Sequence, residues 1–296
     1  MARRVFAHAD ADGVTSAYFI VHYAEEQAWD VIFPSEFGGT DELNPEPTDI
    51  MVDMTPLDPN FPGLVIDHHN QHPETHAYWL IFDHVPASVI TWRHVGEPDD
   101  WKVVVGAVGD GQPEAVPPTI WLKHPILLKD IETYHGYKGN PFSLPLYKLL
   151  SSGINALCRI GEPFEAYQIL SEAESPFDLL DNDEVIEARN TIRQETNHTL
   201  NNLRTVEVLP NVMVGEISSP HRIEGIIASK LYQDNQKTYL IHNRNTGAFA
   251  LRGDLASLVE AILKEKGVRV GGHLAFKGGY AEESVFAILK EWWEVR

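Results

Sequence analysis

The chain has 296 residues, of which 43% are hydrophobic and 22% are charged. This composition predicts a folded protein with one large domain or two ordinary ones, and it excludes a disordered chain. The formal net charge is −20, and residues 1–205 hold 32 acidic against 12 basic residues, while residues 206–296 hold 11 of each. Long nucleic acids are usually bound through basic stripes, so this charge favours a small substrate, although a local basic groove would be compatible with it.

The sequence contains no apolar run long enough to span a bilayer. Its first residues lead directly into a strand-like run, without the apolar segment of an export signal. The single cysteine, Cys158, excludes an internal disulfide and fits a reducing compartment. We therefore expect a cytoplasmic protein that does not associate with membranes.

The first half of the chain alternates short apolar runs with helical patterns, which predicts βαβ units around a parallel sheet. Residues 14–26 have helical spacing, and residues 101–108 fit either a strand or a buried helix. Residues 117–180 are expected to be mostly helical, most clearly at 146–157 and 164–170. The expected strands of this half are 3–8, 29–34, 49–53, 63–67 and 78–83.

Residues 183–205 are polar on most faces and lack proline and glycine, which predicts an exposed connecting helix. We expect this helix to join a parallel-sheet α/β domain at 1–182 to a smaller α/β domain at 206–296. The elements expected in the second domain are strands at 212–216, 238–242, 248–251 and 285–289, with helices at 222–233 and 254–266.

Three of the expected strands end in side chains that can bind metals. These ends are His8-Ala9-Asp10-Ala11-Asp12, Asp53 and Asp67-His68-His69. Taken singly, the first fits a capped helix start, the second an ordinary aspartate at a strand end, and the third a polar turn. Because the carboxyl ends of parallel strands meet at one edge of a sheet, the three ends together predict a dinuclear metal centre.

The spacing of the first motif supports this interpretation. Its polar residues lie two apart, so in extended backbone all three would point to one side, and Gly13 would let the chain turn into the following helix. Mixed carboxylate and imidazole ligation suits manganese or magnesium better than a structural zinc. The donors outnumber the needs of one ion, whereas two ions sharing a carboxylate would use them.

These motifs resemble those of the DHH family of phosphoesterases, which includes RecJ-type exonucleases, nanoRNases and cyclic-dinucleotide phosphodiesterases. The first three motifs are the strand ends described above, and Gly106-Ala107-Val108-Gly109-Asp110 resembles the fourth. The second domain resembles the DHH-associated substrate domain. Its matching segments are Glu224-Gly225-Ile226-Ile227-Ala228, the arginine motif Ala250-Leu251-Arg252-Gly253 and the glycine-rich loop Gly271-Gly272-His273.

The resemblance implies a role for each motif residue. His8 and Asp10 would hold one metal; Asp12, His68 and Asp110 would hold the other; Asp53 would bridge the two. The cofactor would be two Mn²⁺ ions, with Mg²⁺ or Co²⁺ as substitutes, and a bound water would attack in line. Asp67, His68 and His69 would be the catalytic motif, with Asp67 and His69 orienting ligands and stabilising phosphoryl charge. Arg252, Gly271, Gly272 and His273 would bind a substrate phosphate.

The chain departs from the family pattern at Val270, at Gly253 and in Phe276-Lys277-Gly278-Gly279, and these departures leave the subfamily open. Six further histidines are interpreted as surface or loop residues rather than ligands. They are His72, His76, His84, His94, His124 and His135.

The predicted function is a manganese-dependent phosphoesterase that hydrolyses phosphodiester or phosphomonoester bonds of short oligonucleotides or small nucleotides. One alternative is a RecJ-like single-strand-specific exonuclease. Another is a non-catalytic DHH scaffold, which the complete set of ligand positions disfavours. An inorganic pyrophosphatase would share the first-domain motifs, but Arg252 and the glycine-rich loop argue against it. The expected partner is a small nucleotide or a short single-stranded nucleic acid, and the oligomeric state stays open, with a homodimer among the options.

Overall fold

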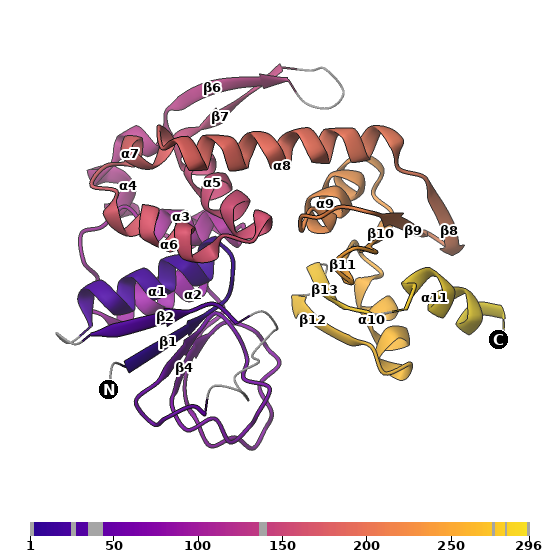
Figure 1. Ribbon diagram of the computed structural model, residues 1–296, viewed down its shortest axis with the longest axis horizontal. Coiled ribbons are helices and arrows are strands. Elements are labelled where there is room, and N and C mark those ends of the chain that lie inside the picture. Colours follow the sequence, from indigo (N-terminus) through magenta and orange to yellow (C-terminus); the bar gives the residue numbers. More distant parts are fainter. Residues whose placement is uncertain are drawn as a thin grey trace. The chain divides into compact units, whose positions relative to one another are not determined.

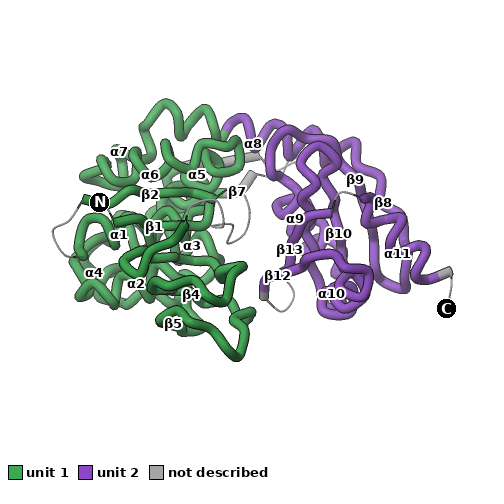
Figure 2. Tube along the Cα trace, turned by 60° about the horizontal axis from the view of Figure 1, so that its bottom comes forward, with its two compact units in different colours: residues 1–189 green, residues 190–296 purple. Residues whose placement is uncertain are grey.

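The computed structural model describes residues 3–24, 28–34, 44–135, 141–273, 276–281 and 283–294. The chain divides into two compact units, residues 1–189 and residues 190–296 (Figure 2). The division falls within the 20-residue helix α8 (Asp183–Asn202). Among the described residues, no helix is both long enough and apolar enough to cross a membrane.

The first unit is built on a five-stranded parallel sheet, as the sequence predicts. The strands are β1 (Arg3–Ala7), β2 (Trp29–Ile32), β3 (Ile50–Val52), β4 (Leu64–Asp67) and β5 (Trp79–Phe82), in the order β2-β1-β3-β4-β5. Figure 1 labels β1, β2 and β4 of this sheet. Along the chain, β2 is added on one side of β1, and β3, β4 and β5 are then added on the other side. The direction in which strands are added to the sheet therefore reverses between β1 and β3. Such switch points leave a crevice at the carboxyl ends of the strands, where ligands bind in open α/β sheets.

The two faces of this sheet are covered differently. One face packs on α1 (Ala11–Tyr23) and α2 (Ala87–His94), with Ile20 and Ile90 buried against Val5 and Ile66. The other face has its own buried cluster around Phe6, Met51 and Phe61, where loop residues replace helices. The first turns of these helices meet near the carboxyl end of β1, where Ala87 and Ser88 of α2 donate N–H groups to Asp12 of α1.

The remaining helices of the first unit follow in sequence. Most of residues 101–108, which fit either element, belong to α3 (Val103–Gly109). The others are α4 (Pro118–Lys123), α5 (Leu146–Ile160), α6 (Pro163–Glu172) and α7 (Pro176–Leu180). The expectation that residues 117–180 are mostly helical is wrong at β6 (Asp130–His135) and β7 (Pro141–Pro145), which form an antiparallel hairpin. Pro141 and Pro145 exclude a continuous helix there.

The second unit contains a six-stranded mixed sheet of order β12-β13-β11-β10-β9-β8. Its strands are β8 (Thr205–Leu209), β9 (Val212–Ile217), β10 (Thr238–Asn243), β11 (Ala248–Arg252), β12 (Arg269–His273) and β13 (Phe276–Tyr280), and its helices are α9 (Glu224–Asn235), α10 (Ala256–Glu265) and α11 (Val285–Glu294). Only β9 and β10 pair in parallel. The core joins the sheet to α10 and α11, with Leu240 packed near Val259 and Leu289.

Two expectations for the second unit are wrong. Residues 285–289 are the first part of α11 rather than a strand, because Val285 and Leu289 lie four apart and both are buried on one helical face. The segment Gly271-Gly272-His273 is not a loop but the end of β12, with Gly271 paired to Gly278 of β13. A glycine-rich segment can therefore be a strand when it pairs with a neighbouring strand.

Candidate metal centre

Asp53 occupies the middle of the site. It follows β3 with a left-handed φ of 58°, and its N–H donates to the Ile66 carbonyl across the strand pair at 2.9 Å. Its side chain is buried between two imidazoles. Asp53 Oδ2 lies 3.5 Å from His8 Nδ1, and Asp53 Oδ1 lies 3.2 Å from His68 Nε2. Each oxygen of the carboxylate thus faces a different histidine.

The first ligand group consists of His8, Asp10 and Asp53, whose donor atoms all lie within 4.8 Å of one another. Asp10 Oδ2 is 2.8 Å from His8 Nδ1, while Asp10 Oδ1 accepts the N–H groups of Asp12 and Gly13. Asp10 is therefore also the N-cap of α1. The expectation of extended backbone through Asp12 is wrong, because α1 begins at Ala11.

Asp12 lies in the first turn of α1, where each oxygen of its carboxylate accepts one N–H group from the start of α2. Its Oδ2 accepts the Ala87 N–H at 2.8 Å and its Oδ1 accepts the Ser88 N–H at 3.0 Å. These are two of the N–H groups that a helix leaves without a partner at its beginning. Asp12 Oδ2 is also 3.9 Å from His68 Nε2. Asp12 thus anchors α2 beside the site and faces His68 from there.

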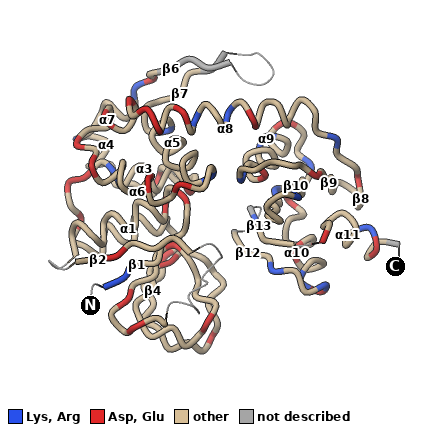
Figure 3. Tube along the Cα trace, viewed as in Figure 1, with Lys and Arg blue, Asp and Glu red and all other residues tan. Residues whose placement is uncertain are grey.

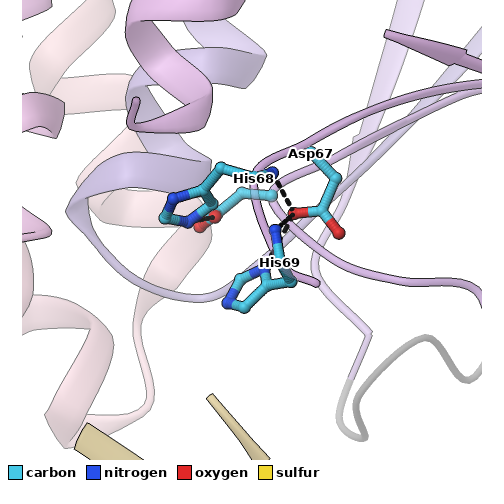
Figure 4. Close-up of side chains that lie close together, drawn as sticks. Asp67, His68 and His69 are labelled. Atoms are coloured by element: carbon cyan, nitrogen blue, oxygen red, sulfur yellow. Dashed lines mark hydrogen bonds and ion pairs between the residues drawn. The ribbon is translucent and has the colours of Figure 1, made fainter. Parts of the chain in front are cut away.

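The second ligand group consists of Asp53, Asp67, His68 and His69, again with donor atoms within 4.8 Å of one another. Figure 4 shows Asp67 beside the two histidines that follow it, with the two rings leaving the turn in different directions. Asp67 Oδ1 accepts the backbone N–H of His68 at 2.8 Å and lies 2.7 Å from His69 Nδ1. At the end of α3, Asp110 Oδ2 is 3.7 Å from His68 Nδ1.

The charges of these groups depend on one another. Burial alone would lower the pKa of His8, but Asp10 and Asp53 outweigh it and raise that pKa to about 10. Burial also disfavours charged His68, yet the neighbouring carboxylates, Asp53 foremost, raise its pKa to about 10. Burial raises the pKa of Asp110 to about 6, with Asp53 acting in the same direction and His68 opposing it. The raised pKa values of both histidines reflect the negative potential of the surrounding carboxylates, and such a potential attracts cations.

This donor set fits divalent cations. Asp53 belongs to both ligand groups, which is the position of a carboxylate shared by two neighbouring ions. Carboxylate and imidazole together suit manganese-type and magnesium ions, and no thiolate is among the donors. The residues that could hold the ions are the predicted set His8, Asp10, Asp12, Asp53, His68 and Asp110, with Asp67 and His69 adjacent.

Sequence reasoning missed two residues that support the site. His72 lies in a loop, as expected, but it is buried against Asp67, with 3.0 Å between His72 Nε2 and Asp67 Oδ2. Its position three residues after His69 was the only signal for it. Asn155 of α5 accepts the Ala11 N–H through its side-chain oxygen at 3.0 Å. Because 144 residues separate this pair, no local pattern could have indicated it.

Comparison with solved structures finds proteins of similar fold. The chain matches RecJ in complex with Mn²⁺ from Thermus thermophilus with a TM-score of 0.69 and 16% identity, over 99% of this chain and 52% of that one. It matches an exonuclease RecJ bound to manganese with a TM-score of 0.65 and 16% identity, over 98% and 89% of the chains. The chain has the RecJ/DHH fold. No family model and no curated protein sequence matches it.

A third structure with the RecJ/DHH fold is the pGpG-specific phosphodiesterase PggH from Vibrio cholerae. It matches with a TM-score of 0.53 and 17% identity, over 95% of this chain and 93% of that one. The resemblance to DHH proteins that the motifs suggested is thus confirmed at the level of the fold. The chain spans about half the length of the Thermus RecJ chain.

The residues predicted to bind substrate lie in the second unit. Arg252 ends β11, and its guanidinium is held inside the unit. Its Nη1 donates to the Lys277 carbonyl at 2.7 Å, and its Nε donates to Ser229 Oγ at 3.2 Å. Gly271 and Gly272 lie on β12, with a positive φ of 117° at Gly272. The side chain of His273 lies outside the described residues.

Proposed function

We propose that the protein is a divalent-metal-dependent phosphoesterase that hydrolyses phosphodiester or phosphomonoester bonds of short oligonucleotides or small nucleotides. The observation that carries this proposal is the position of Asp53, whose carboxylate joins two ligand groups at the carboxyl ends of β1, β3 and β4. Two bound cations would supply the positive charge that stabilises an in-line displacement at phosphorus.

In this proposal, His8 and Asp10 would hold the first cation, while Asp12, His68 and Asp110 would hold the second. Asp53 would be shared by both. Because both Asp12 oxygens also accept N–H groups from α2, Asp12 sets the distance between that helix and His68. The ligands are thus supported by the ends of three strands and the beginnings of two helices, which keeps their geometry fixed.

Asp67 and His69 have a separate role in the proposal. Asp67 Oδ1 lies 2.7 Å from His69 Nδ1, so the ring nitrogen that His69 can offer to a substrate is Nε2. From that atom the imidazolium can donate a hydrogen bond to a phosphoryl oxygen as negative charge accumulates there. Burial disfavours the charged ring, but the contact with Asp67 outweighs it and raises the pKa of His69.

The second unit supplies phosphate recognition in this proposal. Arg252, whose Nε and Nη1 are fixed by neighbouring groups, presents a guanidinium of defined orientation, and a guanidinium pairs well with phosphate oxygens. Gly271 and Gly272 lie on β12, which β13 separates from the strand of Arg252, and because they carry no side chains, an anion could approach the backbone there. His273 follows them in sequence and is the fourth residue assigned to this role.

The charge distribution supports short substrates. Acidic residues, red in Figure 3, outnumber basic ones over the first unit. A long strand that followed this surface would meet repulsion rather than the basic stripe that such binding needs. A substrate of one or a few nucleotides needs to bind only the metal centre and one phosphate-binding site.

The test is hydrolysis measured with Mn²⁺, Mg²⁺ and Co²⁺ on four substrates. These are a dinucleotide, a cyclic dinucleotide, a 3′-phosphorylated nucleotide and a 5′-phosphorylated single strand. Asp53→Asn is the matched control, since it keeps the size of the side chain and tolerates positive φ. Faster turnover of the small substrates, absent from Asp53→Asn, is the expected result.

Two rival functions are outcomes of the same experiment. Processive shortening of the single strand would favour a RecJ-like exonuclease, the alternative supported by the higher TM-scores of the RecJ structures. Absence of hydrolysis together with absence of Mn²⁺ binding in calorimetry would favour a non-catalytic scaffold. Metal binding without hydrolysis of any substrate would contradict both the phosphoesterase and the scaffold hypotheses.

A further inference from the structure

Asp67 is fully buried, and both of its carboxylate oxygens are engaged. Oδ1 faces the DHH turn, where it accepts the His68 N–H and contacts His69 Nδ1. Oδ2 faces the other way. It accepts the Thr55 hydroxyl at 3.0 Å and lies 3.0 Å from His72 Nε2. The plane of the carboxylate is therefore set by groups on both of its edges.

His72 is itself held in one orientation. Its side chain is 8% exposed, and its Nδ1 lies 3.0 Å from the Tyr78 hydroxyl. The ring also meets the edges of Tyr78 and Phe82, with centroid distances of 5.7 and 6.2 Å. The two ring nitrogens of His72 thus face different groups, with Nδ1 at the Tyr78 hydroxyl and Nε2 within 3.0 Å of Asp67 Oδ2. Tyr78, His72 and Asp67 thus form a continuous polar chain.

We propose that His72 is a positioning residue for His69 and acts on it through Asp67. His72 and Thr55 fix Oδ2, the fixed carboxylate holds Nδ1 of His69, and the His69 ring is thereby oriented with Nε2 towards the centre. The kinetic part of this inference rests on the proposed function, in which His69 stabilises phosphoryl charge. Groups that orient a functional residue in this way are commonly worth about 10- to 100-fold in activity, a figure established for the outer shells of metal sites.

The structure provides a conservative variant and a matched control. In His72→Ala, Asp67 keeps Thr55 but loses the second group that defines its plane. We expect kcat to fall by about 10-fold or more, with KM changed less than about twofold, because substrate contacts are untouched. In His72→Gln, the amide nitrogen reaches the position of Nε2, so most of the kcat should return. His76→Ala removes a histidine of the same loop that stacks on Tyr78 at 4.1 Å and should leave kcat near wild type.

A double-mutant cycle with His69→Ala tests whether His72 acts through His69. If it does, His72→Ala causes almost no further loss of kcat once the His69 ring is absent. Equal losses of kcat from His72→Ala in both backgrounds would overturn the proposal. So would a loss in His76→Ala as large as that in His72→Ala, because it would mean that any change in the loop disturbs the site.

A measurement without metal or substrate separates this inference from the proposed function. In the chelator-treated protein, long-range nitrogen–proton NMR spectra report how fast the Nδ1–H of His69 exchanges with water. We expect slow exchange in the wild type and in His72→Gln, and exchange at least about tenfold faster in His72→Ala, where Asp67 can rotate. An unchanged exchange rate in His72→Ala would overturn the positioning role. If no substrate were hydrolysed, the proposed function would fail, while the exchange rates would still decide the role of His72.

Discussion

Asp53 has both an uncommon backbone conformation and a central position between His8 and His68. Its φ of 58° lies in the left-handed region, which aspartate and asparagine tolerate better than other residues with a Cβ and which glycine adopts without cost. The sharp turn after β3 places the carboxylate at the sheet edge instead of along the strand. A residue at this position therefore has to adopt a left-handed backbone conformation and also supply a carboxylate to the metal centre.

This double requirement predicts that two inactive variants differ in stability. Asp53→Gly and Asp53→Ala both remove the carboxylate and should both abolish metal binding. In chelator-containing buffer, Asp53→Gly should be more stable than Asp53→Ala by about 1 kcal/mol, because alanine carries the left-handed penalty. Urea unfolding measures the difference. Equal stabilities would mean that the turn after β3 relaxes when the side chain is shortened.

At the scale of elements, Gly13 decides how closely α1 approaches β1. Gly13 lies within α1 rather than at a turn, and a Cβ on it would overlap the backbone of His8. Gly13→Ala is therefore expected to lose about 3 kcal/mol of stability, although alanine favours helices, and to lose metal binding as His8 and Asp10 move apart. Denaturant unfolding and metal titration measure the two effects.

Gly225→Ala in α9 is the control for this prediction. The nearest atom to the added Cβ would be 3.4 Å away, so the stability of this variant should stay within about 1 kcal/mol of wild type.

A pair of charges joins α10 to β13, and it predicts a pH dependence. Glu260 Oε2 lies 2.8 Å from Lys277 Nζ. Burial opposes ionisation of Glu260, but Lys264 and Lys277 outweigh it and lower its pKa from 4.5. A lowered pKa stabilises the folded protein above pH 4.5, and this contribution is lost as the pH falls through the folded-state pKa.

The expected consequence is a stability difference that depends on pH. Glu260→Gln should be about 1–2 kcal/mol less stable than wild type at pH 7, and the two proteins should converge below about pH 4. Urea unfolding at pH 7, 5 and 3.5 measures the difference. A gap that stayed constant across this range would show that Glu260 contributes by packing alone.

The elements differ in how far the sequence predicts them. The parallel strands were predictable because strands buried on both faces read as continuous apolar runs, such as Ile50-Met51-Val52. The β12–β13 hairpin was not, since its glycines resemble a loop until the two strands are paired. Residues 285–289 have only five positions, too few to separate a strand from a helix.

The same limit applies to the site. The strand-end motifs brought His8, Asp53 and His68 together in the prediction, because sheet geometry fixes where strand ends meet. The separation of polar residues in 8–12 suggested extended backbone, yet Asp10 had the capping preference that starts α1 at once. The contacts of Asp12 with α2 and of Asn155 with Ala11 depend on tertiary packing, so no local sequence pattern indicates them.

At the scale of the whole molecule, the two units have separate cores, and the candidate metal ligands all belong to the first. Thermal unfolding should therefore show two transitions, of which only one responds to Mn²⁺. At a free metal concentration about 100 times the Kd, the first unit should gain about 2.7 kcal/mol, and a chelator should remove the gain. Calorimetry with and without Mn²⁺ measures the shift, and Asp53→Asn should abolish it. A shift of both transitions would contradict the assignment of the ligands to the first unit.

The order of the ligands along the chain has a consequence for biosynthesis. The five strands and all but one of the candidate ligands lie within residues 3–82, and Asp110 follows after α2 and α3. A ribosome adding about 5–20 residues per second exposes the carboxylate cluster seconds before α5, which contributes Asn155, has been made. During that interval a nascent chain would carry closely spaced negative charges without their full support. Early capture of a cation would offset this repulsion, so metal supply during translation should influence the yield of folded protein.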